Sequence, residues 1–196
     1  MWLNSQPVIT EILDAIFLGL ISSTIFYLGT TVLPQYRQKE IAKEYAIGRY
    51  IMTKVDMSRK LFNCCDKNFL NDVNFENNVL NYNVMREALS KDDFYFIQNN
   101  LDRSLIQEIL YDLNQLDVVL THLLTYDFVK CNNNLYRRIM SAQYWIKQFY
   151  GCYEIWYAED DRHDFSKSFV RFIDSFLLGI DSGQKCDDFI TLLRQA

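Results

Sequence analysis

The sequence predicts an all-α protein, with one N-terminal transmembrane helix followed by a cytoplasmic bundle of about five or six helices. Three observations lead to this fold class. An uncharged apolar stretch occupies residues 15–33, proline and glycine are scarce after it, and large apolar residues recur there at helical spacing. The alternating pattern typical of a β-strand does not accompany them.

The apolar stretch, AIFLGLISSTIFYLGTTVL, has the length and composition of a membrane-spanning helix. At about 1.5 Å per residue it spans roughly 28 Å, close to the ~30 Å hydrocarbon core of a bilayer. A signal peptide would begin with basic residues and end at a small-residue cleavage site, and this stretch has neither. A buried core helix, the other alternative, would normally show a polar face. Residues 1–34 are therefore expected to form a short outside N-terminus and a single span.

Charges on the two sides of the span predict its orientation. Arg37, Lys39, Lys43 and Arg49 follow it, whereas the fourteen residues before it contain no base. Because Lys and Arg favour the cytoplasmic side, we expect a single-pass protein of the inner cell membrane, with the N-terminus outside and the C-terminal domain in the cytoplasm.

The same basic residues are candidates for lipid contact. Residues 35–62 carry a net charge of +4, and residues 63–196 carry −7. We expect Arg37, Lys39 and Lys43 to contact anionic lipid headgroups, although fixing the topology alone is the simpler role. The acidic remainder argues against nucleic acid as a ligand, since phosphate contacts require a positive face.

A stripe of small residues runs along one face of the span. Ala15, Gly19 and Ser23 recur every four residues, and such stripes let two helices approach closely in lipid. We therefore expect this face to mediate association between spans. The alternative is chance, because small residues are common in membrane helices.

Residues 35–64 are expected to form a basic juxtamembrane helix, because apolar residues recur among its charges with an approximately helical rhythm. The sequence leaves open whether this helix continues the span or bends at Pro34, since a proline removes one backbone hydrogen bond.

Residues 65–196 are expected to form the cytoplasmic helical bundle. The Asn- and Asp-rich residues 66–78 predict a loop. Among the helices expected after it, residues 104–128 are the clearest, because leucine and isoleucine recur there every three or four positions. The expected helices cover residues 75–90, 91–100, 104–128, 135–158, 165–180 and 186–195.

One dense polar cluster is the candidate metal site. Glu159, Asp160, Asp161, His163 and Asp164 offer carboxylate and imidazole ligands for a divalent cation. A solvated loop between two helices, with Asp164 capping the second, is the simpler interpretation.

Other signatures of catalysis are absent from the sequence. The five cysteines lack metal-type spacing and indicate a reducing compartment. No phosphate-binding glycine loop, nucleophilic serine motif or zinc-binding H-E-x-x-H occurs. We therefore expect no enzymatic activity and no cofactor.

The end of the span reads IFYLGTTVLPQYRQKE and leads into a helical domain. In this layout the chain resembles small bacterial single-span membrane proteins with a helical cytoplasmic domain, some of which are encoded with phage-defence or toxin systems. The resemblance covers roughly residues 10–45 and implies no site residue.

The expected function is that of a non-enzymatic, membrane-anchored interaction protein. It would dock a protein partner or itself at the inner membrane face, in an antiviral defence system, with membrane lipid as a further partner. Neither nucleic acid nor a small-molecule substrate is expected. The alternatives are a membrane-perturbing effector whose spans oligomerise and a cryptic metal-dependent hydrolase that uses the polar cluster.

Overall fold

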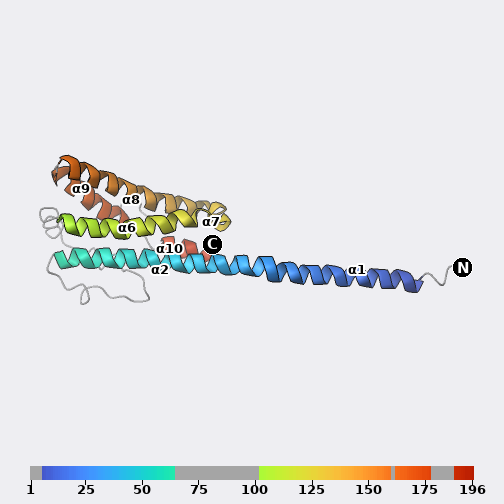
Figure 1. Ribbon diagram of the computed structural model, residues 1–196. Helices are drawn as coiled ribbons and strands as arrows, with labels where there is room; N and C mark the ends of the chain where they lie inside the picture. The colour runs from blue at the N-terminus through green and yellow to red at the C-terminus, as the bar shows by residue number, and fades with distance from the viewer. Residues whose placement is uncertain (1–5, 65–101, 160–161, 178–187) are drawn as a thin grey trace. The chain divides into compact units, whose positions relative to one another are not determined.

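A computed structural model describes residues 6–64, 102–159, 162–177 and 188–196. All secondary-structure elements in these ranges are helical (Figure 1), which confirms the all-α class for the described chain. The chain divides into two compact units, Met1–Ala42 and Lys43–Ala196. The loop and two helices expected between residues 65 and 101 lie outside the described residues.

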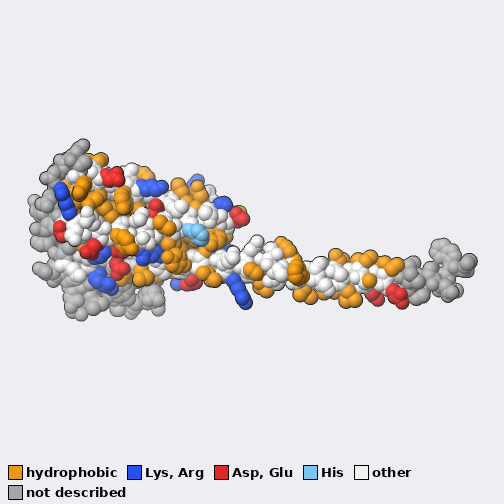
Figure 2. Space-filling model, in the orientation of Figure 1, with side chains coloured by type: hydrophobic (Ala, Val, Ile, Leu, Met, Phe, Trp, Pro, Cys, Tyr) orange, Lys and Arg blue, Asp and Glu red, His pale blue; other side chains and the backbone are white. Residues whose placement is uncertain are grey.

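The first unit is helical throughout the apolar stretch. It contains α1 (Gln6–Tyr27) and the π-helical turn η1 (Leu28–Val32), after which α2 (Leu33–Cys64) begins. Hydrophobic side chains line the described part of α1, residues 10–27 (Figure 2). Among the described residues, the continuous helical stretch Thr10–Leu61 is long and apolar enough to cross a membrane by length and composition, with a mean hydropathy of 1.8 over its most apolar eighteen residues.

Pro34 does not interrupt the helix, which answers the question that the sequence left open. Just before the proline, the backbone N–H of Leu33 donates to the carbonyl of Leu28, five residues earlier. Pro34 is the second residue of α2 and directly follows the π-turn, so the helix continues through it. Thr30 adds a hydrogen bond from its hydroxyl to the Phe26 carbonyl, at 2.8 Å. A local π-turn is one of the ways in which a helix accommodates a proline.

In the second unit, α2 turns a mixed polar and apolar face toward the core. The buried positions recur every three or four residues, which is the period of one helix face. Tyr45 and Met52 lie on the opposite side and are exposed, although Tyr45 belongs to the apolar rhythm that predicted this helix. The buried residues of α2 are Lys43, Ala46, Ile47, Tyr50, Thr53, Lys54, Met57, Ser58 and Leu61.

The helix α6 (Arg103–Leu123) contains the apolar seam that the sequence predicts. Asp102 caps it, because its carboxylate accepts a hydrogen bond from the Ser104 backbone N–H at 3.3 Å. The buried residues are Ile106, Ile109, Leu110, Leu113, Leu116, Val119, Leu120 and Leu123.

The predicted end of this helix, at residue 128, is wrong by five residues. The Thr125 hydroxyl donates to the His122 carbonyl at 2.7 Å, and Tyr126 then adopts an extended backbone. This side-chain bond to a carbonyl of the last turn stabilises the helix end. A separate short helix, α7 (Asp127–Lys130), follows.

The helix α8 (Asn133–Glu159) begins at the asparagine run that predicted a break. The Asn132 side-chain oxygen accepts a hydrogen bond from the Leu135 backbone N–H at 3.1 Å, as an N-cap does. The helix packs against α6, α7, α9 and α10. Its buried side chains are Leu135, Ile139, Gln143, Ile146, Phe149 and Trp156.

The helix α9 (Arg162–Phe172) begins three residues before its expected start, and a π-turn, η3 (Ile173–Leu177), follows it. Asp164 is therefore the third residue of α9 and not its N-cap, so that expectation is wrong. Acidic residues are favoured in a first turn because they face the positive end of the helix dipole. The last helix, α10 (Asp188–Gln195), falls within the expected range 186–195.

Stacked aromatic rings form the core between α8 and α9. Phe149 stacks on Phe172 with ring centroids 4.5 Å apart, and Trp156 stacks on Phe165 at the same distance. All four side chains are buried. Large rings in such offset contacts contribute strongly to core stability, so this cluster holds the two helices together.

Candidate functional site

The most unusual surface among the described residues is that of the first unit. Large apolar side chains are exposed along α1, η1 and the first residue of α2, and none of the most apolar window is buried. Soluble monomers rarely expose contiguous apolar area on this scale. The residues are Ile12, Leu13, Ile16, Phe17, Leu18, Leu20, Ile21, Ile25, Phe26, Tyr27, Leu28, Val32 and Leu33.

Three hydroxyl side chains within this apolar surface bond to the helix itself. Ser23 and Thr24 both donate to the Leu20 carbonyl, at 2.9 and 2.7 Å, and Thr30 donates to the Phe26 carbonyl. These hydroxyls therefore do not depend on water for a hydrogen-bond acceptor. At these positions the sequence is polar, but the hydroxyl groups form their hydrogen bonds within the helix itself.

The predicted association stripe is open. Ala15, Gly19 and Ser23 are all exposed, and a Cβ built at Gly19 would meet no atom within 4 Å. The face is accessible to a second helix, and association through it stays a prediction.

The three bases predicted to contact lipid headgroups differ in their surroundings. Arg37 is exposed and Lys39 is half-buried. Lys43 is only 6% exposed, and its ammonium lies 5.6 Å from the centre of the Phe128 ring, a cation–π distance. Arg37 and Lys39 are therefore the better placed of the three for contact with a headgroup.

The predicted polar cluster falls where two helices meet along the chain. Glu159 is the last residue of α8, and His163 and Asp164 lie in the first turn of α9. The side chains of Glu159, Asp160, Asp161, His163 and Asp164 lie outside what the structure describes. In the part of the chain that it does describe, no three His, Cys, Asp or Glu side chains gather as a metal site requires.

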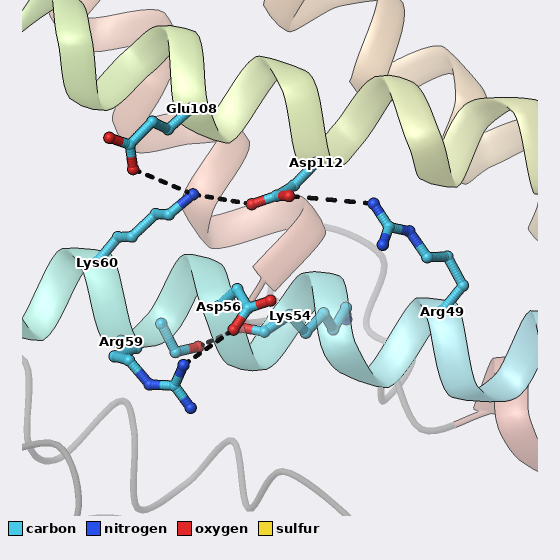
Figure 3. A network of polar contacts seen from close by, with 8 residues as sticks. Arg49, Lys54, Asp56, Arg59, Lys60, Glu108 and Asp112 are labelled. Carbon is cyan, nitrogen blue, oxygen red and sulfur yellow. Dashed lines mark hydrogen bonds and ion pairs between the residues drawn. The ribbon is translucent and has the colours of Figure 1, made fainter.

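An ion network joins α2 to α6 in the second unit (Figure 3). The Lys60 ammonium lies 2.8 Å from Asp112 and 3.4 Å from Glu108. The other Asp112 oxygen lies 4.0 Å from the Arg49 guanidinium. Asp112 therefore stands between two cations, and its side chain is only 18% exposed. Partly buried networks of this kind hold two helices in register.

Substituting Asp112 by asparagine should lower the free energy of unfolding by about 1–2 kcal/mol, because Lys60 and Arg49 would lose their shared anion. Denaturant titration of the purified protein measures this loss. The control is Asp127→Asn, whose carboxylate pairs with Lys130 but is almost fully solvent-exposed, and which should be nearly neutral. Equal effects of the two variants would show that the network adds no stability.

Lys54 is the most deeply buried base among the described residues, with no solvent exposure. Its ammonium lies 4.6 Å from the centre of the Tyr50 ring and 5.2 Å from that of Phe176. Two aromatic faces thus stabilise the positive charge by cation–π contact. The site is enclosed and therefore structural in character.

A shallow depression of about 450 Å³ lies beside the start of α8. Its lining offers amide groups for hydrogen bonding, one thiol and no acidic or basic side chain. The lining residues are Phe128, Cys131, Asn132, Asn133, Asn134, Gln195 and Ala196.

Sequence reasoning missed the buried lysines and the ion network. One signal was available: Lys43 and Lys54 fall in helical phase with Ala46, Tyr50 and Met57. Because lysines are normally expected on the solvated face of a helix, the burial of these two was not expected from the sequence. No comparable signal identifies Asp112, because its partners Lys60 and Arg49 lie on a helix distant in sequence.

Comparison with known proteins gives no family for this chain. No protein-family model, no curated protein and no solved structure matches it.

Proposed function

We propose that this chain is a membrane-anchored interaction protein without catalytic activity. In this proposal one helix spans the membrane, and the helical domain behind it docks a protein partner or a second copy at the cytoplasmic face. The observation that carries the proposal is the surface of α1 and η1, which is apolar on all sides and exposed over the length of a bilayer core.

The energetics favour insertion. Thirteen large apolar side chains are exposed from Ile12 to Leu33. On the scale of membrane-insertion experiments, the twelve Leu, Ile, Phe and Val residues among them each contribute about 0.3–0.6 kcal/mol, which sums to about 4–7 kcal/mol. The carboxylates of Glu11 and Asp14 precede the apolar core and would lie in the headgroup region, where a charge costs little.

The basic residues after the span support the proposed orientation. Arg37 and Lys39 follow the apolar segment, and no Lys or Arg precedes it in the sequence. By the positive-inside rule, the end of the span that carries these bases faces the cytoplasm. The second unit follows that end and would therefore lie in the cytoplasm. There both bases would meet anionic headgroups.

An exposed face on α8 supports the proposed docking role. Tyr136, Met140, Tyr144 and Ile155 are exposed and recur on one side of the helix. Tyrosine and methionine are enriched at protein interfaces, where they supply large contact area. The aromatic side chains of this domain thus serve both its core and its outer surface.

Fractionation of cells that express the protein tests the anchor. The protein should stay in the membrane pellet after alkaline carbonate extraction, which removes peripheral proteins. Release into the supernatant would overturn the proposal.

Labelling of Cys131 tests the orientation, because this thiol is free and exposed in the second unit. A membrane-impermeant maleimide should modify Cys131 in inside-out vesicles and leave it unmodified in intact spheroplasts, as read by mass spectrometry of the Cys131 peptide. The Cys131→Ser variant is the control for the assignment of that peptide. Labelling from the outer side would reverse the topology.

A further inference from the structure

We infer that α2 pairs in parallel with the α2 of a second copy of this chain, through a seam formed by Tyr45, Gly48, Met52 and Val55. The inference rests on the proposed function, because a single span fixes every copy in the same orientation. Two neighbouring copies in one membrane can then present this helix face to each other only in parallel.

The seam has the spacing of a two-stranded helical contact. Its residues are separated by three, four and three positions, the a and d pattern of a heptad. Tyr45 is 64% exposed and Met52 is 58% exposed, while Val55 is half-buried. A Cβ at Gly48 would meet no atom within 4 Å, so no described atom occupies the space over Gly48.

The seam lies opposite the face of α2 that packs into its own domain. Tyr50, Lys54 and Met57 lie at the centre of the buried face and are at most 4% exposed. At about 100° per residue, Tyr45 and Met52 lie roughly half a turn away from them. A partner helix on the seam would therefore leave the core contacts of α2 intact.

Charge complementarity across a parallel pair identifies the second copy as the occupant. Glu44 directly precedes the seam residue Tyr45, and Arg49 directly follows Gly48. In a parallel heptad contact these are g and e′ positions, so Glu44 of each copy faces Arg49 of the other. Two such pairs form, one on each side of the twofold axis.

The surroundings of Arg49 and Glu44 permit this pairing. Among the described residues, Arg49 is only partly satisfied. Its guanidinium lies 4.0 Å from Asp112, and its Nε atom is buried without a hydrogen-bond partner among the described residues. Its side chain remains 24% exposed, and Glu44 is exposed. A second carboxylate can therefore approach the outer side of the guanidinium.

The membrane compensates for the small size of the contact. A seam of about three helical turns buries less area than a stable dimer of soluble proteins requires. Anchoring both copies in one membrane raises their effective concentration without adding contacts. The pairing is therefore expected in membranes or micelles. It should weaken when detergent dilutes the protein.

Sedimentation of the full-length protein in detergent micelles, over a range of protein-to-detergent ratios, tests the inference. The wild type should dimerise, and Met52→Glu and Glu44→Lys should each weaken the dimer at least about tenfold. The matched control is Val118→Glu on α6, where a valine 60% exposed is replaced by the same acid. This control should dimerise like the wild type, and thermal unfolding should show unchanged midpoints for all variants.

Each remaining outcome either supports or overturns the pairing through α2. A membrane-embedded monomer, or a dimer that Met52→Glu leaves intact, overturns the inference. Disruption by Gly19→Ile together with an intact Met52→Glu dimer assigns the contact to the span instead. A lowered unfolding midpoint for Met52→Glu alone shows that the chain covers its own seam. A soluble dimer that Met52→Glu disrupts supports the seam and overturns the membrane anchor.

Discussion

Arginine at both Leu20 and Ile25 should release the protein from the membrane. The two residues lie near the middle of the apolar segment and are exposed. An arginine at the centre of a membrane helix costs about 2.5–3.5 kcal/mol, so two cost about 5–7 kcal/mol of insertion free energy. After alkaline extraction the variant should appear in the supernatant, whereas the wild type should stay in the pellet.

The control for this variant is Leu20→Ala combined with Ile25→Ala. It removes the same two large side chains but adds no charge, and it should remain in the pellet because the helix stays apolar throughout. Retention of the double arginine variant would show that the segment does not span the bilayer.

Truncation of Phe149 to alanine should strongly destabilise the second unit. The Phe149 ring is almost fully buried and lies 4.5, 5.4 and 5.7 Å from the rings of Phe172, Phe169 and Phe165. Its loss leaves a cavity between α8 and α9, which costs about 3–5 kcal/mol in comparable cores. Denaturant titration followed by tryptophan fluorescence should show the unfolding midpoint at much lower denaturant.

Tyr144→Ala provides the matched control on the same helix. Its ring is exposed, so its loss should change the free energy of unfolding by less than about 1 kcal/mol. Similar effects of the two truncations would mean that the aromatic rings between α8 and α9 are not a packed core. Membrane fractionation of the Phe149 variant separates loss of folding from loss of the anchor, because Phe149 lies outside the apolar segment.

Much of the helical framework could be predicted because its signals are local. The starts expected at residues 104 and 135 lie one and two residues from the observed ones, where Asp102 and Asn132 each bind a backbone N–H two or three residues ahead. The apolar seam of α6 follows from spacing alone, and the residues expected in it are all buried: Ile106, Ile109, Leu113, Leu116, Leu120 and Leu123. Helix ends without a clear cap were predicted less well, as the early end of α6 at Leu123 shows.

The candidate contacts could be predicted less well because their partners are remote. Lys60 and Asp112 form their ion pair across 52 positions of sequence, and hydropathy patterns contain no such information. The same holds for Lys54, whose burial depends on Tyr50 in its own helix and on Phe176 far along the chain. A sequence shows that a lysine is present, but the packed helices decide whether it meets water or aromatic rings.

The amino-acid sequence by itself determined the all-α class, the apolar N-terminal helix and most of the helices that follow. Each of these depends on the hydropathy, spacing and capping of residues close together in the chain. Only the tertiary structure decided that Lys43 and Lys54 are buried, that Asp112 links two helices, and that Tyr45 and Met52 stay exposed. The physical reason is that burial and ion pairing depend on which helix faces meet, and that choice is made by contacts between residues far apart in sequence.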